Sequence, residues 1–466
     1  MISGLKPYRE YKESELPWLK QVPSHWGLVP NRGLVRKRKV LVGERHAEYR
    51  LLSLTKQGVI VRDISTGKGK FSSDMGTSQE VRDGDLVFCL FDVPETPRTV
   101  GLSRYDGMIT GAYTVFESLG RGSTEYFESF YRAMDDRKLL SPLYSGLRNT
   151  IPTARFLGSK TPQPPMAEQQ AIVRFVGWAN DRLERAIRSK RKVIALLNEQ
   201  KQAIVHRAVT RGLDPNVSLK PSGVPWLGDI PAHWEVRRLK HLIQARLTYG
   251  ANAAAEFTNS DWPRYIRITD FRKDGSLKPE TFRSLPPAMA ANYLVQPGDI
   301  LFARSGATVG KAFLVPNLAS PACYAGYLIR AQPNKKLVIP DYLFAFSQSK
   351  TFASWKDSTF NTATIQNIGA DKYANLDIPL PSLSEQEAIL NSLMSEQRPM
   401  LISISHLERE IELLLEYRTC LVADVVTGKL DVREAAAKLP DDIPLGHAFD
   451  VELEGDADTP KEEVSE

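Results

Sequence analysis

Cysteine is scarce in this chain of 466 residues, which contains only Cys89, Cys323 and Cys420. The three are far apart and match neither a zinc-ligand spacing nor a disulfide framework, which predicts a reducing compartment. Apolar runs of about 18 residues are missing too, so no transmembrane helix is expected. The N-terminal sequence also lacks the apolar stretch of a signal peptide. These absences predict a cytoplasmic protein that makes no membrane contact.

Motifs for catalysis are equally hard to find. We find no Gly-rich dinucleotide turn, no Asn-Pro-Pro-aromatic motif of a base methyltransferase, and no acidic cluster of a nuclease. The segment RSGATVGKA, residues 304–312, resembles a phosphate-binding loop, but Gly306 stands too close to Gly310 and Lys311. Ala312 also replaces the Ser or Thr that binds magnesium. We therefore expect a strand, a turn with a basic tip and a strand here. The chain is predicted to be non-catalytic and to hold no cofactor or metal.

Charge is unevenly distributed along the chain. Residues 434–466 carry 11 acidic and 2 basic side chains, a net charge of −9, whereas the whole chain carries +6. The rest of the chain therefore carries +15, which favours a polyanionic partner, although a merely basic protein would look the same. The acidic tail is expected to be disordered.

A repeat runs through most of the sequence. LPWLKQVPSHW at 16–26 returns as VPWLGDIPAHW at 224–234, including both tryptophans, and only 7 of 466 residues are Trp. Further along, DGDLVF matches PGDILF, PPMAEQQAI matches PSLSEQEAI, and VTRGLD matches VTGKLD. The central part of each copy matches poorly. The pattern predicts a duplicated unit with a divergent centre. His25 and His233 recur beside Trp and are expected to pack or cap rather than to catalyse.

Each copy divides into a strand-rich part and a helical part. Short apolar runs separated by turn residues predict a mixed α/β domain with a mainly antiparallel or mixed sheet. The following segment has apolar residues at steps of three and four over several heptads, which predicts a long coiled-coil helix. Neither helix can bury its apolar seam alone. The predicted fold class is therefore α+β, with two mixed α/β domains separated by an antiparallel pair of long coiled-coil helices in a pseudo-twofold internal repeat.

Details of the helical segments are also predicted. Ser384 is expected to cap the second helix, and Pro399 to kink or split it. Lys190 interrupts the first seam, which then continues to Val193. The residues predicted to form the helix-pair interface are Ile172, Val176, Leu183, Leu197, Ile404, Leu407, Ile411 and Leu414.

The predicted limits are 1–165 for the first recognition domain, 166–212 for the first helix, 213–382 for the second domain, 383–433 for the second helix and 434–466 for the tail. A twofold molecule with a basic body fits double-stranded DNA. Lys and Arg would neutralise phosphates, and Arg, Asn and Gln would reach base edges. Candidate DNA-binding residues are Arg36, Lys37, Arg38, Lys39, Lys68, Lys70, Arg148, Arg155, Arg246, Arg264, Arg267, Arg272, Lys273, Arg304, Lys311, Gln366 and Asn367.

The repeated segments resemble a known family, the DNA specificity subunits of type I restriction–modification systems. The resemblance covers nearly all of 14–433 and depends on GVPWLGDIPAHWEVRRLK, GDILFARSGATVGK, IPLPSLSEQEAI and LLLEYRTCLVADVVTGKLDV. It implies two target-recognition domains that each read one half of a bipartite, asymmetric DNA site. It also implies that Glu168-Gln169 and Glu385-Gln386 begin the spacer helices. The first copy departs from the pattern, because NTIPTARFLGSK lacks the Gln-Asn-Ile of the second.

The resemblance also implies partners. In that family the subunit is a non-catalytic scaffold for two methyltransferase subunits, which use S-adenosylmethionine, and two restriction subunits, which use ATP and Mg²⁺. Two alternatives stay open at this point: a fragment of a fused restriction–methylation enzyme, and a coiled-coil adaptor with no DNA role. The DNA target cannot be read from the chain.

Overall fold

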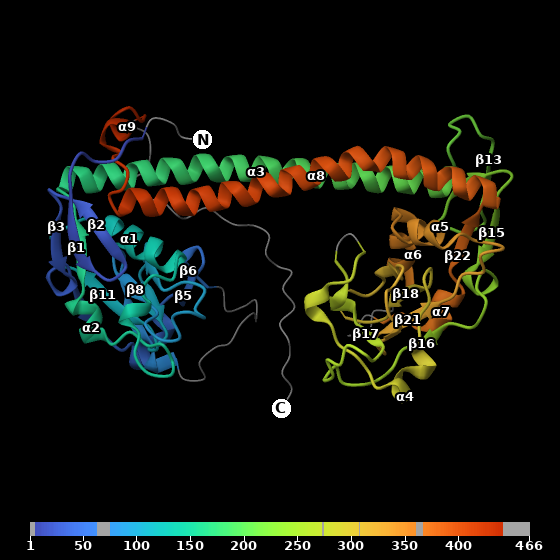
Figure 1. Ribbon diagram of the computed structural model, residues 1–466, viewed down its shortest axis with the longest axis horizontal. Coiled ribbons are helices and arrows are strands. Elements are labelled where there is room, and N and C mark those ends of the chain that lie inside the picture. Colours follow the sequence, from blue (N-terminus) through green and yellow to red (C-terminus); the bar gives the residue numbers. More distant parts are fainter. Residues whose placement is uncertain (1–4, 63–74, 273–274, 307, 360–366, 441–466) are drawn as a thin grey trace. The chain divides into compact units, whose positions relative to one another are not determined.

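The computed structural model describes residues 5–62, 75–272, 275–306, 308–359 and 367–440. The fold is α+β, as predicted, and it divides into two compact units. Unit 1 comprises Met1–Arg191 with Glu408–Glu466, and unit 2 comprises Lys192–Leu407. Each unit contains a sheet-rich globule and part of two long helices (Figure 1). The domain limits given above stay a prediction.

Unit 1 is built on a four-stranded antiparallel sheet of order β4-β11-β8-β9. Antiparallel pairs β1-β2, β3-β12, β5-β6 and β7-β10 surround it. Its strands are β1 (Tyr11–Leu16), β2 (Leu19–Pro23), β3 (Gly27–Pro30), β4 (Val35–Arg38), β5 (Leu52–Thr55), β6 (Gly58–Val61), β7 (Gln79–Val81), β8 (Leu86–Phe88), β9 (Val100–Leu102), β10 (Gly107–Ile109), β11 (Thr114–Ser118) and β12 (Lys160–Gln163). Its short helices are α1 (Thr124–Asp136), α2 (Thr153–Gly158) and α9 (Arg433–Ala437).

Unit 2 repeats this plan with a four-stranded antiparallel sheet of order β16-β21-β18-β19. The pairs β13-β14 and β15-β22 are antiparallel, whereas β17 and β20 pair in parallel. Its strands are β13 (Leu219–Pro221), β14 (Asp229–Pro231), β15 (Glu235–Arg238), β16 (Thr248–Tyr249), β17 (Arg264–Ile266), β18 (Ile300–Ala303), β19 (Ala312–Leu314), β20 (Ala322–Tyr324), β21 (Leu328–Ala331) and β22 (Asp377–Leu380). Its short helices are α4 (Pro287–Ala290), α5 (Pro340–Ser347), α6 (Lys350–Thr359) and α7 (Ala370–Ala374).

The strand orders of the two central sheets correspond one to one. β4, β8, β9 and β11 occupy the positions of β16, β18, β19 and β21. The repeated GDLVF and GDILF segments form β8 and β18, so the best-matched sequence of each globule lies inside its sheet. The parallel pair in unit 2 has an antiparallel counterpart in unit 1, which places a topological difference in the divergent centre.

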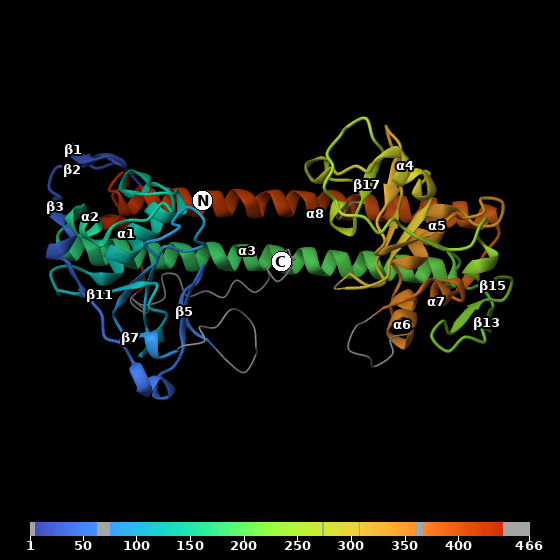
Figure 2. The ribbon, with the colours of Figure 1, turned by 90° about the horizontal axis from the view of Figure 1, so that it is seen from below.

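The two long helices, α3 (Met166–Arg211) and α8 (Leu383–Val426), are antiparallel and in contact. Within unit 1 the first part of α3 lies beside the last part of α8 (Figure 2). Their buried side chains belong to one core cluster, which includes Ile172, Val176, Ala179, Leu421, Val422 and Val425. Within unit 2 the last part of α3 and the first part of α8 share a second cluster, which includes Val205, Ala208, Val209, Ile389 and Leu393.

The seam differs in detail from the predicted row. Ile187 is fully buried although it lies outside the row, and Val193 is 42% exposed, so the prediction for Val193 is wrong. An α-helix has 3.6 residues per turn, and a strict heptad row therefore drifts around its surface. Lys190 interrupts the apolar seam, and its ammonium pairs with the Glu410 carboxylate of α8. Arg418 of α8 likewise pairs with the buried Glu184 of α3, at 3.3 Å.

Two details of α8 follow from the structure. The helix is not split at Pro399, since α8 continues from Leu383 to Val426, and a kink there stays a prediction. Its cap is Ser382 rather than Ser384, because the Glu385 amide donates to Ser382 Oγ at 3.3 Å. After α8, α9 begins at Arg433, and Arg174 of α3 donates to the carbonyls of Leu439 and Pro440. The limits of the tail stay a prediction. Residues 441–466 lie outside the described residues.

The repeated His-Trp motif holds the start of each long helix. In unit 1, Trp26 Nε1 donates to Glu168 Oε1 at 2.9 Å, and His25 Nε2 lies 2.8 Å from Glu168 Oε2. In unit 2, Trp234 Nε1 donates to Glu385 Oε1 at 3.0 Å, and His233 Nε2 lies 2.9 Å from Glu385 Oε2. Both carboxylates are in the first turn of their helix, where the helix dipole favours negative charge. The expectation that the histidines pack or cap is confirmed.

Unit 1 adds a third donor to this junction. The Tyr8 hydroxyl donates to Glu168 Oε1 at 2.6 Å, and the Arg433 guanidinium lies 5.2 Å from the centre of the Tyr8 ring. Burial and the hydrogen bond to Glu168 raise the pKa of Tyr8 far above its usual value, which keeps its proton in place. The Glu168 side chain is 4% exposed, whereas that of Glu385 is 26% exposed.

The next residue of each helix ties it to the globule. In unit 1 the Ser123 amide, at the cap of α1, donates to Gln169 Oε1 at 2.7 Å, and Gln169 Nε2 donates to the Pro164 carbonyl. In unit 2 the Ile339 amide, at the cap of α5, donates to Gln386 Oε1 at 2.8 Å, and Gln386 Nε2 donates to the Pro381 carbonyl. The Glu-Gln pair therefore joins the repeated His-Trp motif and the long helix to α1 in unit 1 and to α5 in unit 2.

Tyrosines in α1 and α5 hold the end of the other long helix. The Tyr126 hydroxyl donates to the Val426 carbonyl of α8 at 3.1 Å. The Tyr342 hydroxyl donates to the Pro379 carbonyl at 2.9 Å and also lies 3.4 Å from the Val209 carbonyl of α3. After α8, Gly428 has a φ of +77°, and a Cβ there would lie 2.4 Å from Pro23 Cδ. Glycine is therefore required for this close approach.

We predict that the two junctions differ in how much they stabilise the fold. Glu168→Ala leaves three donors without an acceptor and should lower the free energy of unfolding by about 3 kcal/mol. Glu385→Ala leaves two donors at a site that water can reach, and should cost about 1 kcal/mol. Chemical denaturation of the full chain measures both. Glu168→Gln, which keeps one acceptor oxygen, is the matched control and should fall between. An equal or larger cost at Glu385 would contradict this ranking.

Candidate nucleic-acid interface

Arg36, Lys37 and Arg38 lie on β4, an edge strand of the central sheet of unit 1, and Lys39 directly follows it. Arg36 is exposed and pairs with the Glu117 carboxylate. Arg38 is 11% exposed and pairs with Glu80 at 2.9 Å and with Asp85. The pKa of the Asp85 carboxyl is raised by burial, which the hydrogen bond from the Arg82 amide and the Arg38 charge offset only in part. Arg38 therefore stabilises the globule, whereas Lys37 and Lys39 are exposed.

A tight hairpin in unit 1 carries Arg148. The hairpin is closed by backbone hydrogen bonds in both directions between residues 145 and 150. Arg148 is exposed, donates to both carboxylate oxygens of Asp92 and lies 5.8 Å from the centre of the Phe91 ring. The hydrogen bond from Arg148 lowers the pKa of the Asp92 carboxyl. Arg155 donates to the carbonyls of Leu143 and Tyr144, so it braces the base of the hairpin.

Three arginines of unit 2 mainly hold one segment together. Arg264 donates to the Lys278 carbonyl at 2.6 Å, and burial lowers the pKa of its guanidinium. Arg267 pairs with the buried Asp270 at 3.0 Å and donates to the Thr281 carbonyl. Arg272 is exposed and pairs with Glu280 at 3.3 Å. Of these three, Arg272 has the most accessible side chain.

A second group in unit 2 brings Arg304, Lys311 and Asn367 to one region. β18 and β19 pair antiparallel, and the described residues between them connect the two strands, which agrees with the predicted strand, turn and strand. Lys311 and Asn367 are exposed, and Ser305 forms a backbone bridge with Asn367. Arg246 is exposed in the loop before β16. Lys68, Lys70, Lys273 and Gln366 lie outside the described residues.

The loops that differ most in sequence share a backbone arrangement. In unit 2 the Ile368 amide donates to the Arg304 carbonyl at 2.9 Å, just before α7. In unit 1 the Ile151 amide donates to the Leu90 carbonyl at 2.7 Å, just before α2. The NTIPTARFLGSK segment is thus placed like its counterpart, although it lacks the Gln-Asn-Ile sequence. The sequences of the two segments do not reveal this equivalence, because backbone hydrogen bonds do not depend on which side chains are present.

The predicted helix-pair residues differ in exposure. Ile172, Val176, Leu183, Ile404 and Ile411 are buried. Leu197, Leu407 and Leu414 are half-buried. Their assignment to one continuous interface stays a prediction, as does that of the DNA-binding residues.

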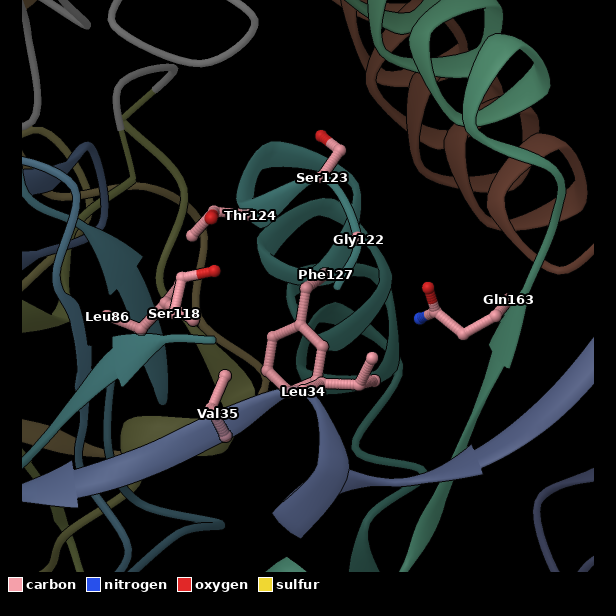
Figure 3. Close-up of a pocket in the computed structure, with 9 residues that line it drawn as sticks. All are labelled: Leu34, Val35, Leu86, Ser118, Gly122, Ser123, Thr124, Phe127 and Gln163. Atoms are coloured by element: carbon pink, nitrogen blue, oxygen red, sulfur yellow. The ribbon is translucent and has the colours of Figure 1, made fainter. Parts of the chain in front are cut away.

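A small pocket lies beside the start of α1 in unit 1 (Figure 3). Figure 3 shows Phe127 and Leu34 at its apolar side and Gln163 at its polar side. Its volume of about 10 Å³ is near the least that holds one water molecule, so it cannot take a nucleotide or S-adenosylmethionine. In the described part of the chain we find no cluster of three His, Cys, Asp or Glu side chains suited to a metal ion. Within the same residues, no helix combines the length and apolarity that a membrane span requires.

Comparisons with known proteins agree with this architecture. Residues 231–413 match the family model described as type I restriction modification DNA specificity domain. The specificity subunit of the type I restriction enzyme MjaVIII, from Methanocaldococcus jannaschii, is 24% identical over 297 residues, which cover 60% of this chain and 64% of that protein. The StySPI specificity subunit from Salmonella potsdam is 24% identical over 208 residues, which cover 44% of each chain. These matches therefore span less than two thirds of the curated relatives.

A solved structure supports the fold. A chain from a study of complex assembly and conformational transition of the type I R-M system superposes with a TM-score of 0.60. It shares 16% sequence identity and covers 88% of this chain and 99% of its own length. At this identity the likeness concerns the fold. The family-model match over residues 231–413, the curated relatives and the duplicated globules all point to the type I restriction modification DNA specificity family.

Proposed function

We propose that this chain is the DNA specificity subunit of a type I restriction–modification complex. Each globule reads one half of a bipartite, asymmetric site in double-stranded DNA. The observation that carries the proposal is the contrast between two equivalent scaffolds and their dissimilar loops. The sheet orders and the Glu-Trp-His junctions repeat, whereas the segments with the predicted DNA contacts differ in sequence and in part in topology. A duplicated scaffold with different loops suits a site whose two halves differ.

The chain serves as a scaffold rather than as a catalyst. Two methyltransferase subunits supply methylation with S-adenosylmethionine, and two restriction subunits supply ATP- and Mg²⁺-dependent cleavage. The support from this chain is that its repeated His-Trp and Glu-Gln residues lie at the helix junctions, where they hold the fold. The basic side chains that remain accessible, including Lys37, Lys39, Arg246 and Lys311, supply the charge that phosphate contacts require.

We predict that the purified chain alone neither methylates nor cleaves DNA and does not hydrolyse ATP. Together with a co-expressed type I methyltransferase subunit, it should direct adenine methylation to a fixed two-part site. Transfer of labelled methyl groups, followed by mapping of the modified positions, measures this. The methyltransferase subunit without this chain is the control and should lose the site preference. Methyl transfer by the pure chain would contradict the assignment as a non-catalytic subunit.

We further predict that the long helices set the gap between the half-sites, since α3 and α8 both continue from one unit into the other. Seven residues inserted in each helix, between 191 and 192 and between 407 and 408, lengthen it by about 10 Å. This corresponds to about three base pairs of B-form DNA. Methylation mapping on a library with randomised gaps should show a longer gap and unchanged half-sites.

An insertion of two residues in each helix is the matched control. It rotates the apolar seam away from its partner, whereas a heptad keeps the seam nearly in register. The two-residue variant should therefore assemble poorly. An active heptad variant that kept the original gap would show that the helices do not set the spacing.

A further inference from the structure

Arg304 follows β18 in unit 2, and its backbone is fixed from two sides. The Arg304 amide donates to the Tyr327 carbonyl at 3.0 Å, next to β21. Its carbonyl accepts from the Ile368 amide at 2.9 Å, next to α7. Neighbouring segments on both sides therefore set the position of its Cα, and little conformational entropy is left for binding to remove.

The side chain of Arg304 is fixed as well. Its guanidinium carbon lies 5.0 Å from the centre of the Tyr249 ring, within the range of a cation–π contact. The Tyr249 hydroxyl in turn accepts from the Ala370 amide at 3.0 Å, so α7 holds the ring in place. Tyr249 remains 43% exposed, so the stacked pair lies at the surface.

The Arg304 guanidinium differs from the other described arginines in its hydrogen bonds. Arg304 Nε is buried and has no acceptor among the described residues. Within the same residues we find no carboxylate or carbonyl bonded to its terminal nitrogens. The other described arginines of the predicted DNA-binding set differ from it, because most are committed to acceptors inside the protein. These are Arg36, Arg38, Arg148, Arg155, Arg264, Arg267 and Arg272.

We propose that Arg304, oriented by Tyr249, reads a guanine base in the half-site bound by unit 2. This inference rests on the proposed DNA-binding function and deepens it. A phosphate contact requires only positive charge, which a mobile lysine supplies. Reading a guanine requires a planar donor pair in a fixed orientation toward O6 and N7 in the major groove. Stacking on Tyr249 fixes the guanidinium plane, and the unused terminal N–H groups are the donors that guanine needs. Tyr249 is then a positioning residue.

The position equivalent to Arg304 in unit 1 is Leu90, by the offset that aligns the two GDLVF-like segments. Leu90 is buried, and its carbonyl accepts from Ile151 as that of Arg304 accepts from Ile368. The same backbone position therefore presents a reading side chain in one unit only. Removal of Arg304 should consequently alter one half-site and leave the other unchanged.

The test is selection of binding sites by the full chain from a randomised duplex library, with DNA affinity measured at several salt concentrations. With Arg304→Ala, preference for a G·C pair at one position should be lost. Affinity for the original site should fall about tenfold to a hundredfold, and affinity for sites changed at that position should fall little. Arg304→Lys keeps the positive charge but lacks the planar pair of N–H donors, so it should not restore the preference for G·C at that position. Tyr249→Ala should weaken preference at the same position.

Lys311→Ala is the matched control, because it removes one exposed cation from the same turn. It should weaken binding to all sequences alike and reduce the salt dependence by about one counterion. The retained second half-site reports that each variant is folded. If Arg304→Ala behaves like Lys311→Ala, or if Arg304→Lys restores the full preference, Arg304 contacts phosphate and the inference is overturned. If the wild-type chain selects no two-part sequence, the proposed function itself fails.

Discussion

A carboxylate in the first turn of each long helix is the interaction on which the rest of the structure depends. Glu168 is nearly inaccessible to solvent and accepts from Trp26 and Tyr8 beside His25. A buried charge is costly unless its lone pairs are satisfied, so this position requires donors from outside the helix. Trp26 of the repeated His-Trp motif supplies one donor from 142 residues earlier in the chain, and Tyr8 supplies another from 160 residues earlier. The same requirement arises at Glu385, and the sequence meets it with the same His-Trp pair. The motif is therefore repeated because two helices need the same start.

The repeated residues also fix the direction in which the helices run. Within unit 1, Trp26 holds the start of α3 while Tyr126 holds the last turn of α8. Unit 2 exchanges the roles: Trp234 holds the start of α8, and Tyr342 lies beside the last turn of α3. One globule can bind the beginning of one helix and the end of the other only if the helices are antiparallel. The antiparallel arrangement is thus encoded at the helix ends as well as along their apolar seams.

Much of this fold could be predicted from the sequence, because hydrophobic periodicity and repetition are local signals. The duplication, the short antiparallel strands and the long paired helices follow from such patterns. The role of each basic residue could not be predicted in the same way. Arg38 looks like part of an exposed basic run, yet its partner Asp85 lies 47 residues away on a neighbouring part of the sheet. Arg148 likewise pairs with Asp92, which lies 56 residues away in the chain. Ion pairs between distant segments produce no regular spacing pattern by which the sequence could reveal them.

Leu90 and Arg304 show how the same backbone position can carry different side chains in the two units. Both follow the central strand of their sheet, and both offer a carbonyl to the isoleucine that precedes the next helix. Because these hydrogen bonds belong to the backbone, the side chain can change from a buried leucine to a stacked arginine without disturbing them. Tyr249 lies on β16, whose counterpart in unit 1 is the basic strand β4. Side chains at equivalent strand ends can therefore differ between the units, while the Glu-Gln junctions that hold the long helices stay the same.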